Sequence, residues 1–228
     1  MSSDQITNIA IFVIPIIIAI TFHEAAHGYV ALYFGDDTAK KAGRLTLNPL
    51  KHIDLFGTIL LPLFLFIYTG SAFGWAKPVP VTFSRLNDPR WDMGFVAAAG
   101  PAMNLILALV SALAWRLAAS SGATTQSLVM SLLDQSLTLN VILAVFNLLP
   151  IPPLDGSKIV APLLPQALAR PYLALERFGM LILILILIVV PIVAAQSGIA
   201  FNLFQTFVLE PADDVVKIIM SVFGIGPA

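Results

Sequence analysis

His23, Glu24 and His27 are the residues of this chain whose types and spacing most clearly point to chemistry. In a helix, His23 and His27 lie one turn apart, so both imidazoles can face one divalent metal ion. Glu24 lies beside them, where it can take a proton from a water molecule. A polar network that ties helices together is the alternative, but it does not require this spacing. The pattern therefore predicts a metal-dependent hydrolytic site.

The chain around this motif has the composition of a membrane protein. It has 228 residues, of which 58% are hydrophobic and 11% charged, and its mean hydropathy is +0.92. A soluble domain carries about 25% charged residues. An acidic residue at membrane depth costs roughly 2.5–3.5 kcal/mol on insertion scales, so it is expected to be paired or used. We therefore expect water-dependent chemistry inside a lipid bilayer.

The charge balance and the lack of cysteine narrow the possible partners and ligands. The net charge of −1 offers no basic surface to nucleic acid, so no nucleic-acid partner is expected. The chain contains no cysteine, which leaves histidine and carboxylate as the strong metal ligands.

Four segments are long and apolar enough to cross a membrane, and they are Ile9–Phe34, Met93–Ala118, Leu128–Leu149 and Phe178–Ala195. A fifth, Leu55–Tyr68, is about 14 residues long, contains Pro62 and has the length of a re-entrant or interfacial segment. The acidic residues after Asn202 indicate one or two interfacial helices there.

The distribution of lysine and arginine favours four crossings. The chain has 12 such residues. If Leu55–Tyr68 does not cross, Arg116 and Lys217 lie on one side and the other ten on the opposite side; if it crosses, the division is even. The positive-inside rule then predicts an external N-terminus. His27 would lie about 10 Å below the cytoplasmic surface, and Asp155, which follows the third span, would emerge on that same side.

A catalytic zinc ion needs a third protein ligand. Asp155 and His52 are the candidates. Spacing alone leaves Asp155 either a ligand or the N-cap of a helix that begins at Gly156. His52 lies in a polar connector, which favours a structural hydrogen bond for it.

Five blocks of sequence, taken in order, carry a family resemblance. They are His23-Glu24-x-x-His27, Gly43-Arg-Leu-Thr-Leu-Asn48-Pro49-Leu-Lys-His52-Ile-Asp54, Gly74-Trp-Ala-Lys-Pro-Val-Pro-Val81, Gly100-Pro101-x-x-Asn104 and Asn147-Leu-Leu-Pro150-x-Pro152-x-Leu154-Asp155-Gly156. Over about residues 9 to 165, the chain resembles the site-2 protease family of intramembrane zinc metalloproteases.

The resemblance implies roles for individual residues. Asp155 would be the third ligand of one zinc ion per chain, beside His23 and His27, and Glu24 the catalytic base. Asn147 would help to hold substrate or to stabilise the oxyanion. Many members carry a PDZ or CBS domain, for which this chain has no room, so it would be a minimal catalytic core. Ser157 stands where a second glycine is common, which bears only on the local backbone.

Two further features leave alternatives open. Asn104 follows a patch of small residues and either hydrogen-bonds between helices or faces substrate, while Asn140 is interpreted as packing. The segment Lys77–Phe83 alternates proline with valine. It is either a plain connector or an edge strand whose Val79 and Val81 contact an unwound substrate.

We therefore expect an all-α polytopic membrane protein with about four transmembrane helices and a re-entrant or β-rich insertion between residues 43 and 85. It would be a single membrane-embedded domain over residues 1–228, with a catalytic core at about 9–165 and a C-terminal span and interfacial helices at 172–228. The membrane would be the cell membrane of a prokaryote, with the active site toward the cytoplasm.

The expected function is hydrolysis of peptide bonds in membrane-spanning protein substrates, in or near the lipid bilayer. A non-catalytic zinc-binding scaffold is one alternative, but it would not need Glu24. A metal transporter is another, and it would need ionisable residues along a full path across the bilayer. Leu128–Leu149 and Phe178–Ala195 contain none apart from Asp134.

Overall fold

Long apolar helices form the body of the protein in the computed structural model, which describes residues 3–60, 64, 74–122, 127–197 and 202–226. The 4 stretches that are long and apolar enough to cross a membrane are Ile6–Tyr33, Trp91–Ser120, Leu128–Leu148 and Gln166–Ala194. They overlap the four expected spans, so the predicted all-α polytopic fold is confirmed. The protein is an integral membrane protein.

The longer helices are α1 (Ser3–Tyr33), α4 (Trp91–Ser120), α5 (Leu128–Leu148) and α10 (Glu210–Val222). The fourth apolar stretch is built from α7 (Gln166–Ala174), η5 (Leu175–Phe178), α8 (Gly179–Ile184), η6 (Leu185–Val189) and α9 (Val190–Gln196). Short helices connect these elements: α2 (Thr38–Lys41), η1 (Pro49–Lys51), η2 (Leu55–Leu60), η3 (Phe83–Arg85), α6 (Asp155–Val160), η4 (Ala161–Leu163) and η7 (Gln205–Leu209).

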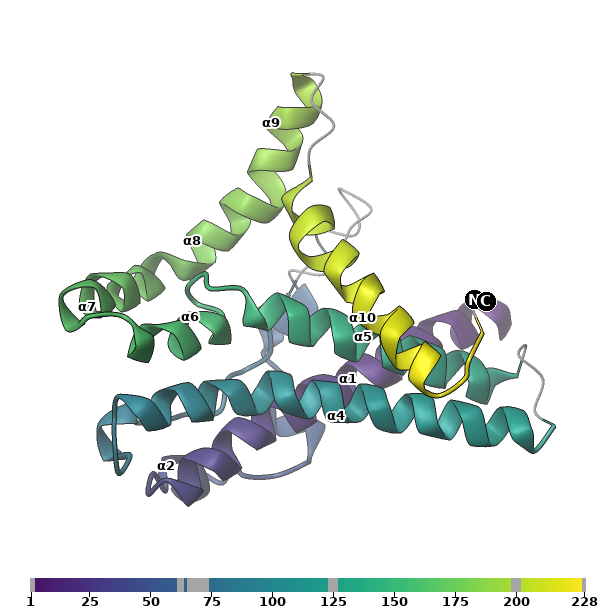
Figure 1. The fold of residues 1–228 in the computed structure, drawn as a ribbon, viewed down its shortest axis with the longest axis horizontal. Coiled ribbons are helices and arrows are strands. Elements are labelled where there is room, and N and C mark those ends of the chain that lie inside the picture. The colour runs from purple at the N-terminus through teal and green to yellow at the C-terminus, as the bar shows by residue number, and fades with distance from the viewer. Residues whose placement is uncertain (1–2, 61–63, 65–73, 123–126, 198–201, 227–228) are drawn as a thin grey trace.

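Small side chains let α1, α4 and α5 pack closely. Ala19 and Ala31 on α1, Ala108 and Ala112 on α4 and Ala144 on α5 are all fully buried. Without large side chains between them the helix backbones can approach each other, as is usual between helices in membranes. Figure 1 shows these three helices side by side, with α8 and α9 leaning away from them. The three close-packed helices form the centre of the bundle.

Side-chain hydrogen bonds stabilise the turn before α4 and the first turn of α5. The Asp88 carboxylate accepts a hydrogen bond from the backbone nitrogen of Trp91 (3.2 Å), and Asp92 accepts one from the backbone nitrogen of Asp88 (2.7 Å). At the start of α5, the Ser127 hydroxyl accepts from the backbone nitrogen of Met130 (3.3 Å). Such caps satisfy backbone donors that have no partner within the helix.

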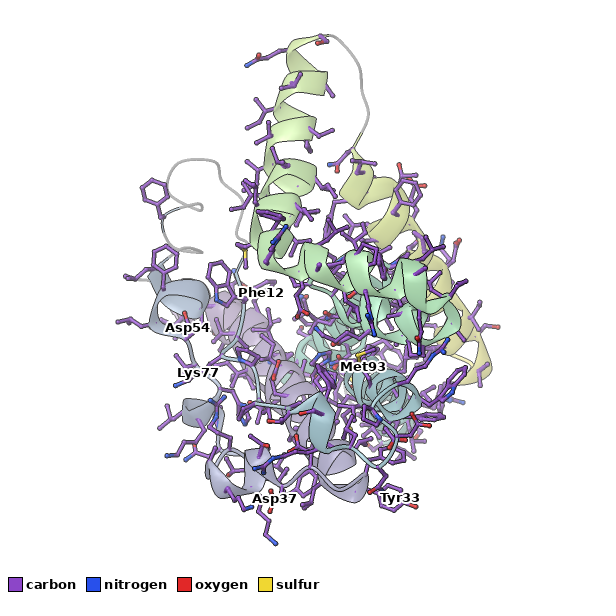
Figure 2. The ribbon with its side chains drawn as sticks, turned by 90° about the vertical axis from the view of Figure 1, so that its left-hand side faces the viewer. Phe12, Tyr33, Asp37, Asp54, Lys77 and Met93 are labelled. Atoms are coloured by element: carbon purple, nitrogen blue, oxygen red, sulfur yellow. The ribbon has the colours of Figure 1, made fainter. Side chains whose placement is uncertain are left out.

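The insertion between α2 and α4 lies against the end of α1. Its extended part is held by three backbone donors: Trp75 to the Gly57 carbonyl (3.0 Å), Lys77 to the His52 carbonyl (2.9 Å) and Thr82 to the buried Asp36 carboxylate (2.6 Å). Viewed from the end that carries α2, Asp54 and Lys77 of the insertion lie on one side of the bundle (Figure 2).

The described residues of the insertion contain no strand, so of the two alternatives for Lys77–Phe83 the structure has the connector and not the edge strand. The physical reason is that Pro78 and Pro80 have no backbone N–H, and the Val79 N–H bonds to Glu24 instead of to a neighbouring strand. Of the expected segment Leu55–Tyr68, Leu55–Leu60 is helical. Residues 61–63 and 65–73 lie outside the described residues, so re-entry stays a prediction.

The C-terminal helix α10 packs one face on the bundle. Its Ala212 and Ile219 are buried in a cluster that contains Ala108 of α4 and Val141 of α5. Its charged residues lie on the exposed face, where Lys217 pairs with Asp213 and Asp214. In Figure 1, α10 returns from the end of α9 along α5. A position at the membrane interface stays a prediction for this helix.

The ends of the bundle can be assigned to the two sides of the membrane by cysteine labelling. The natural chain has no cysteine, so single-cysteine variants are unambiguous. Lys40 on α2 and Ser121, the residue after α4, are exposed, and α2 and the C-terminal end of α4 lie at opposite ends of the bundle (Figure 1). We expect a membrane-impermeant maleimide to label the Ser121→Cys variant in intact cells and the Lys40→Cys variant only after permeabilisation. The reverse pattern would invert the predicted orientation.

Candidate metal centre and active-site cavity

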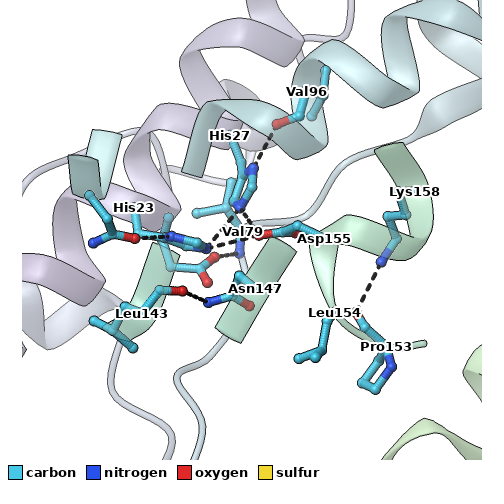
Figure 3. Close-up of polar contacts among 12 residues, drawn as sticks. His23, His27, Val79, Val96, Leu143, Asn147, Pro153, Leu154, Asp155 and Lys158 are labelled. Atoms are coloured by element: carbon cyan, nitrogen blue, oxygen red, sulfur yellow. Dashed lines mark hydrogen bonds and ion pairs between the residues drawn. The ribbon is translucent and has the colours of Figure 1, made fainter. Parts of the chain in front are cut away.

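Three ligand atoms meet where α1 faces the start of α6. The Nε2 atoms of His23 and His27 are 3.1 Å apart. One carboxylate oxygen of Asp155, Oδ2, lies 3.2 Å from the first and 3.3 Å from the second. Bonds of about 2.0–2.1 Å to a tetrahedral zinc ion place neighbouring ligand atoms roughly 3.3 Å apart. The triangle of atoms therefore has the size of one face of a zinc coordination shell (Figure 3).

The Asp155 carboxylate is prepared for a cation. Its Oδ2 atom is buried and has no hydrogen-bond partner, and an unpartnered buried oxygen is costly unless a ligand satisfies it. Burial alone would raise the pKa of Asp155, but the neighbouring imidazoles of His27 and His23 hold that pKa well below its usual range. The lowered pKa favours the carboxylate form, which is the form that binds a metal ion.

The turn between α5 and α6 delivers Asp155 to the histidines. Leu154 is the N-cap of α6 and Asp155 the first helical residue, with no side-chain capping bond, so the geometry favours a ligand over a cap. A Cβ atom on Gly156 would lie 2.2 Å from the Leu148 carbonyl oxygen, so glycine is needed for α6 to start this close to α5. The Ser157 hydroxyl is buried and donates to the Leu154 carbonyl (2.7 Å), which accommodates serine at this position.

Gly100 on α4 packs directly against both imidazoles. A Cβ atom at this position would lie 2.5 Å from both His23 Cε1 and His27 Nε2, and 2.6 Å from His23 Nε2. Real side chains do not approach so closely, so only glycine leaves room for the two imidazoles. The close packing of α1 on α4 thus sets the position of both ligands.

Hydrogen bonds from α4 fix the orientation of each imidazole. The Nδ1 atom of His27 bonds to the Val96 backbone carbonyl (2.7 Å), and Nδ1 of His23 bonds to the Asn104 side-chain oxygen (2.6 Å). Metal-binding histidines usually donate their second ring nitrogen in this way, which leaves the other nitrogen free for the metal. Both Nε2 atoms consequently point into the triangle.

Asn104 lies behind His23 and not beside the cavity. Its side chain is 0% exposed, and its amide nitrogen donates to Asn140 (2.9 Å). Of the two alternatives for Asn104, these contacts agree with hydrogen bonding between helices, because both polar atoms of its side chain are engaged there.

Glu24 faces the same cavity as the ligands. Its Oε2 atom accepts a hydrogen bond from the backbone nitrogen of Val79 (2.7 Å), which comes from the extended part of the insertion. Pro78 and Pro80 flank Val79 and have no N–H, so Val79 provides the one backbone donor of this three-residue stretch. The insertion thereby holds the candidate base beside the ligand triangle.

A cavity of about 410 Å³ opens onto the ligands. Its apolar walls include Val81, Phe83, Val96 and Met180, and its polar lining includes Asn147 beside the metal ligands. Asn147 donates one amide N–H to the Leu143 carbonyl (3.0 Å) (Figure 3). Of the residues expected to contact substrate, Asn147, Val79 and Val81 line the cavity, although the Val79 N–H is bonded to Glu24.

His52 and the pair Lys158–Glu176 complete the comparison with the sequence. His52 is buried and bonds through Nε2 to the Thr46 carbonyl (2.9 Å), outside the ligand triangle.

The ammonium group of Lys158 bonds to Glu176 Oε1 (2.8 Å), and both residues line the cavity. Sequence reasoning missed this pair, because no pattern links α6 to η5 across 18 residues. It also missed the contact of Gly100, for which the small residues from Ala97 onward were the available signal.

Comparisons with known proteins agree with this geometry. The model of Peptidase family M50 matches residues 11–121 and 116–190. "Putative zinc metalloprotease YwhC" of Bacillus subtilis (strain 168) is 43% identical over 184 residues, which are 79% of this chain and 80% of that protein.

Two mycobacterial proteins, each named "Putative zinc metalloprotease Rip2", are more distant. The protein of Mycolicibacterium smegmatis is 29% identical over 187 residues, 80% of this chain and 70% of its own length. That of Mycobacterium tuberculosis (strain H37Rv) is 29% identical over 190 residues, 83% of this chain and 71% of its own length. No solved structure matches the chain. The family and these names agree with a His-His-Asp site for zinc.

Substitution of Gly100 tests whether the close helix contact sets the metal site. Gly100→Ala should raise the zinc dissociation constant roughly 10–100-fold, because the added methyl group must displace both imidazoles. Competition with a chromogenic chelator in detergent measures this. Gly94→Ala on the same helix is the matched control, since its Cβ would lie 3.4 Å from the nearest atom, in Pro162. Equal zinc affinity in the two variants would contradict the role of Gly100.

Proposed function

Because the chain belongs to peptidase family M50, the site-2 protease family, we propose that it is an intramembrane zinc metalloprotease that hydrolyses peptide bonds of membrane-spanning proteins. The observation that carries the proposal is the meeting of three metal ligands and Glu24 at one cavity, within helices that can cross a membrane. A metalloprotease as such follows from the family. The substrate class and the reaction inside the bilayer are the proposal.

Glu24 is the proposed general base. A bound zinc ion supplies a Lewis acid that lowers the pKa of water toward about 7 and polarises a carbonyl group. Val79 holds Oε2 of Glu24, so Oε1 is the oxygen placed to accept a proton from the attacking water. Glu24 then delivers that proton to the leaving amine. His23, His27 and Asp155 hold the metal throughout.

Asn147 is the proposed donor to the substrate. One N–H of its amide is bonded to Leu143 within its own helix, which restrains the side chain, and Asn147 lines the cavity. The second N–H is then available to a substrate carbonyl oxygen. A positioned amide donor of this kind stabilises negative charge that develops on that oxygen.

The cavity favours an unwound segment of a transmembrane helix as substrate. Peptide bonds in a helix are internally hydrogen-bonded, so a few residues must unwind before one of them reaches the ligands. The apolar walls formed by Val81, Phe83 and Met180 suit the side chains of such a segment. The extended segment Trp75–Val81 also lines this cavity, so the unwound part of a substrate can lie parallel to it.

The cut is proposed to fall near the cytoplasmic side. His27 lies six residues before the end of α1 at Tyr33, which corresponds to about 9 Å along the helix axis. That end carries α2, with its two lysines, and the excess of basic residues favours a cytoplasmic position for it.

The mechanism is tested by comparing cleavage with zinc binding. Reconstituted wild type should cleave members of a panel of single-span proteins, and product masses should locate the cut inside the span. Glu24→Gln should bind zinc normally and cleave at least roughly 10²–10⁴-fold more slowly, because the amide cannot accept the proton. Asp155→Ala should lose both zinc and cleavage. Glu210→Gln, an exposed change on α10, is the matched control and should behave as wild type.

Two results of this experiment would contradict the proposal. Cleavage by Glu24→Gln at the wild-type rate would refute the mechanism. A wild type that binds zinc but cleaves no member of the panel would favour a zinc-binding scaffold.

A further inference from the structure

His23 is linked to a buried chain of amide groups that crosses the helix bundle. Its Nδ1 atom bonds to the Asn104 side-chain oxygen on α4 (2.6 Å), and the Asn104 side-chain nitrogen donates to the Asn140 side-chain oxygen on α5 (2.9 Å). The Asn140 side-chain nitrogen then donates to the backbone carbonyl of Ser136 (2.9 Å). Both asparagines are 0% exposed. The chain therefore runs from a metal ligand to a backbone group two helices away.

The Ser136 end determines the direction of every hydrogen bond in this chain. A backbone carbonyl can only accept, so Asn140 must turn its NH₂ group toward Ser136 and its oxygen toward Asn104. Asn104 must then donate through its NH₂ group, which also lies 3.4 Å from the Ala19 carbonyl. Its oxygen is left to face His23, which must donate from Nδ1. A neutral imidazole with its proton on Nδ1 has its lone pair on Nε2.

We propose that Asn104 and Asn140 are positioning residues that fix the tautomer of His23, so that the Nε2 lone pair points at the zinc site. His27 reaches the same state by a direct bond to the Val96 carbonyl. His23 has the side chain of Asn104 in place of such a carbonyl, and a lone amide can present either its oxygen or its NH₂ group. Asn140 removes that ambiguity through its short contact with the Asn104 NH₂ group (2.9 Å), which the longer contact with the Ala19 carbonyl (3.4 Å) reinforces.

Neutral amides suit this task in a bilayer. A carboxylate behind His23 would also accept the Nδ1 proton, but it would bring a second buried charge close to Asp155, and charges at membrane depth are costly. With two asparagines, the Ser136 carbonyl still determines which end of each amide donates and which accepts, and no charge is added. Each amide oxygen also has a donor, because His23 donates to the Asn104 oxygen and Asn104 donates to the Asn140 oxygen.

Zinc affinity tests this inference independently of proteolysis. The inference rests on the zinc site of the proposed function, but zinc binding can be measured even if no substrate is cleaved. Asn104→Leu should raise the zinc dissociation constant roughly 10–100-fold, and Asn140→Leu should raise it roughly tenfold, as expected for outer partners of a metal-bound histidine. The full chain in detergent is titrated against a competing chelator.

Ser136→Ala is the matched control. It removes the Ser136 hydroxyl, which lies 3.4 Å from the Asn140 nitrogen, and keeps the backbone carbonyl at 2.9 Å. Zinc affinity should therefore stay at the wild-type value. A loss in Ser136→Ala as large as in Asn140→Leu would overturn the inference, since packing would then explain both. Wild-type affinity in Asn140→Leu would overturn it too.

The proton position gives a second readout that a merely structural role would not move. Nitrogen-15 NMR of chelator-treated wild type should show His23 protonated at Nδ1, whereas Asn140→Leu should show a mixture of tautomers. Asn104→Asp, which keeps an acceptor facing His23, should regain most of the zinc affinity lost in Asn104→Leu. Unfolding temperatures in chelator identify any variant that fails to fold. A wild-type His23 with its proton on Nε2 would refute the proposal.

Discussion

The close approach of α1 to α4 at Gly100 is the constraint on which the rest of the site depends. There is no space for a side chain between the α4 backbone and the two imidazoles. This contact brings Val96 and Asn104 of α4 within hydrogen-bond distance of His27 and His23. With both rings fixed from behind, their Nε2 atoms meet the Asp155 carboxylate without any further support from the cavity side. Helix packing and ligand geometry are therefore one problem, since any change that separates the helices also disorders the ligands.

Buried polar groups around the site differ in whether they have hydrogen-bond partners. Asn104 and Asn140 each use both ends of the amide, whereas Asp155 Oδ2 has no hydrogen-bond partner. Because buried polar atoms are costly when unpaired, this difference separates the supporting network from the atom that is expected to hold a metal. Asp36, between α1 and α2, holds the insertion in a similar way, because its carboxylate accepts the Thr82 N–H next to the extended segment that carries Val79.

Sequence patterns predicted the spans and the candidate ligand pair. They did not predict which face each helix turns toward its neighbours. Apolar runs locate α1, α4 and α5 to within a few residues, and the spacing of His23 and His27 requires only a helix. Such helices are hydrophobic nearly all round, so periodicity does not say which face meets which neighbour. The alternatives for Asn104 remained open for that reason. Asp155 could equally have been an N-cap by spacing, and the family motif and the position of Oδ2 are what favour a ligand.

The lack of a strand at Lys77–Phe83, which was one of two alternatives for this segment, shows how one long-range contact can decide its local structure. Alternating proline and valine at Lys77–Phe83 indicated an edge strand, and the segment is extended. However, its prolines remove alternate donors, and the Val79 donor between Pro78 and Pro80 is bonded to Glu24. Pairing with a second strand through Val79 would require the base to give up this partner. The Val79 N–H of the extended segment is thus used to orient Glu24. A substrate strand alongside this segment must bind through other groups.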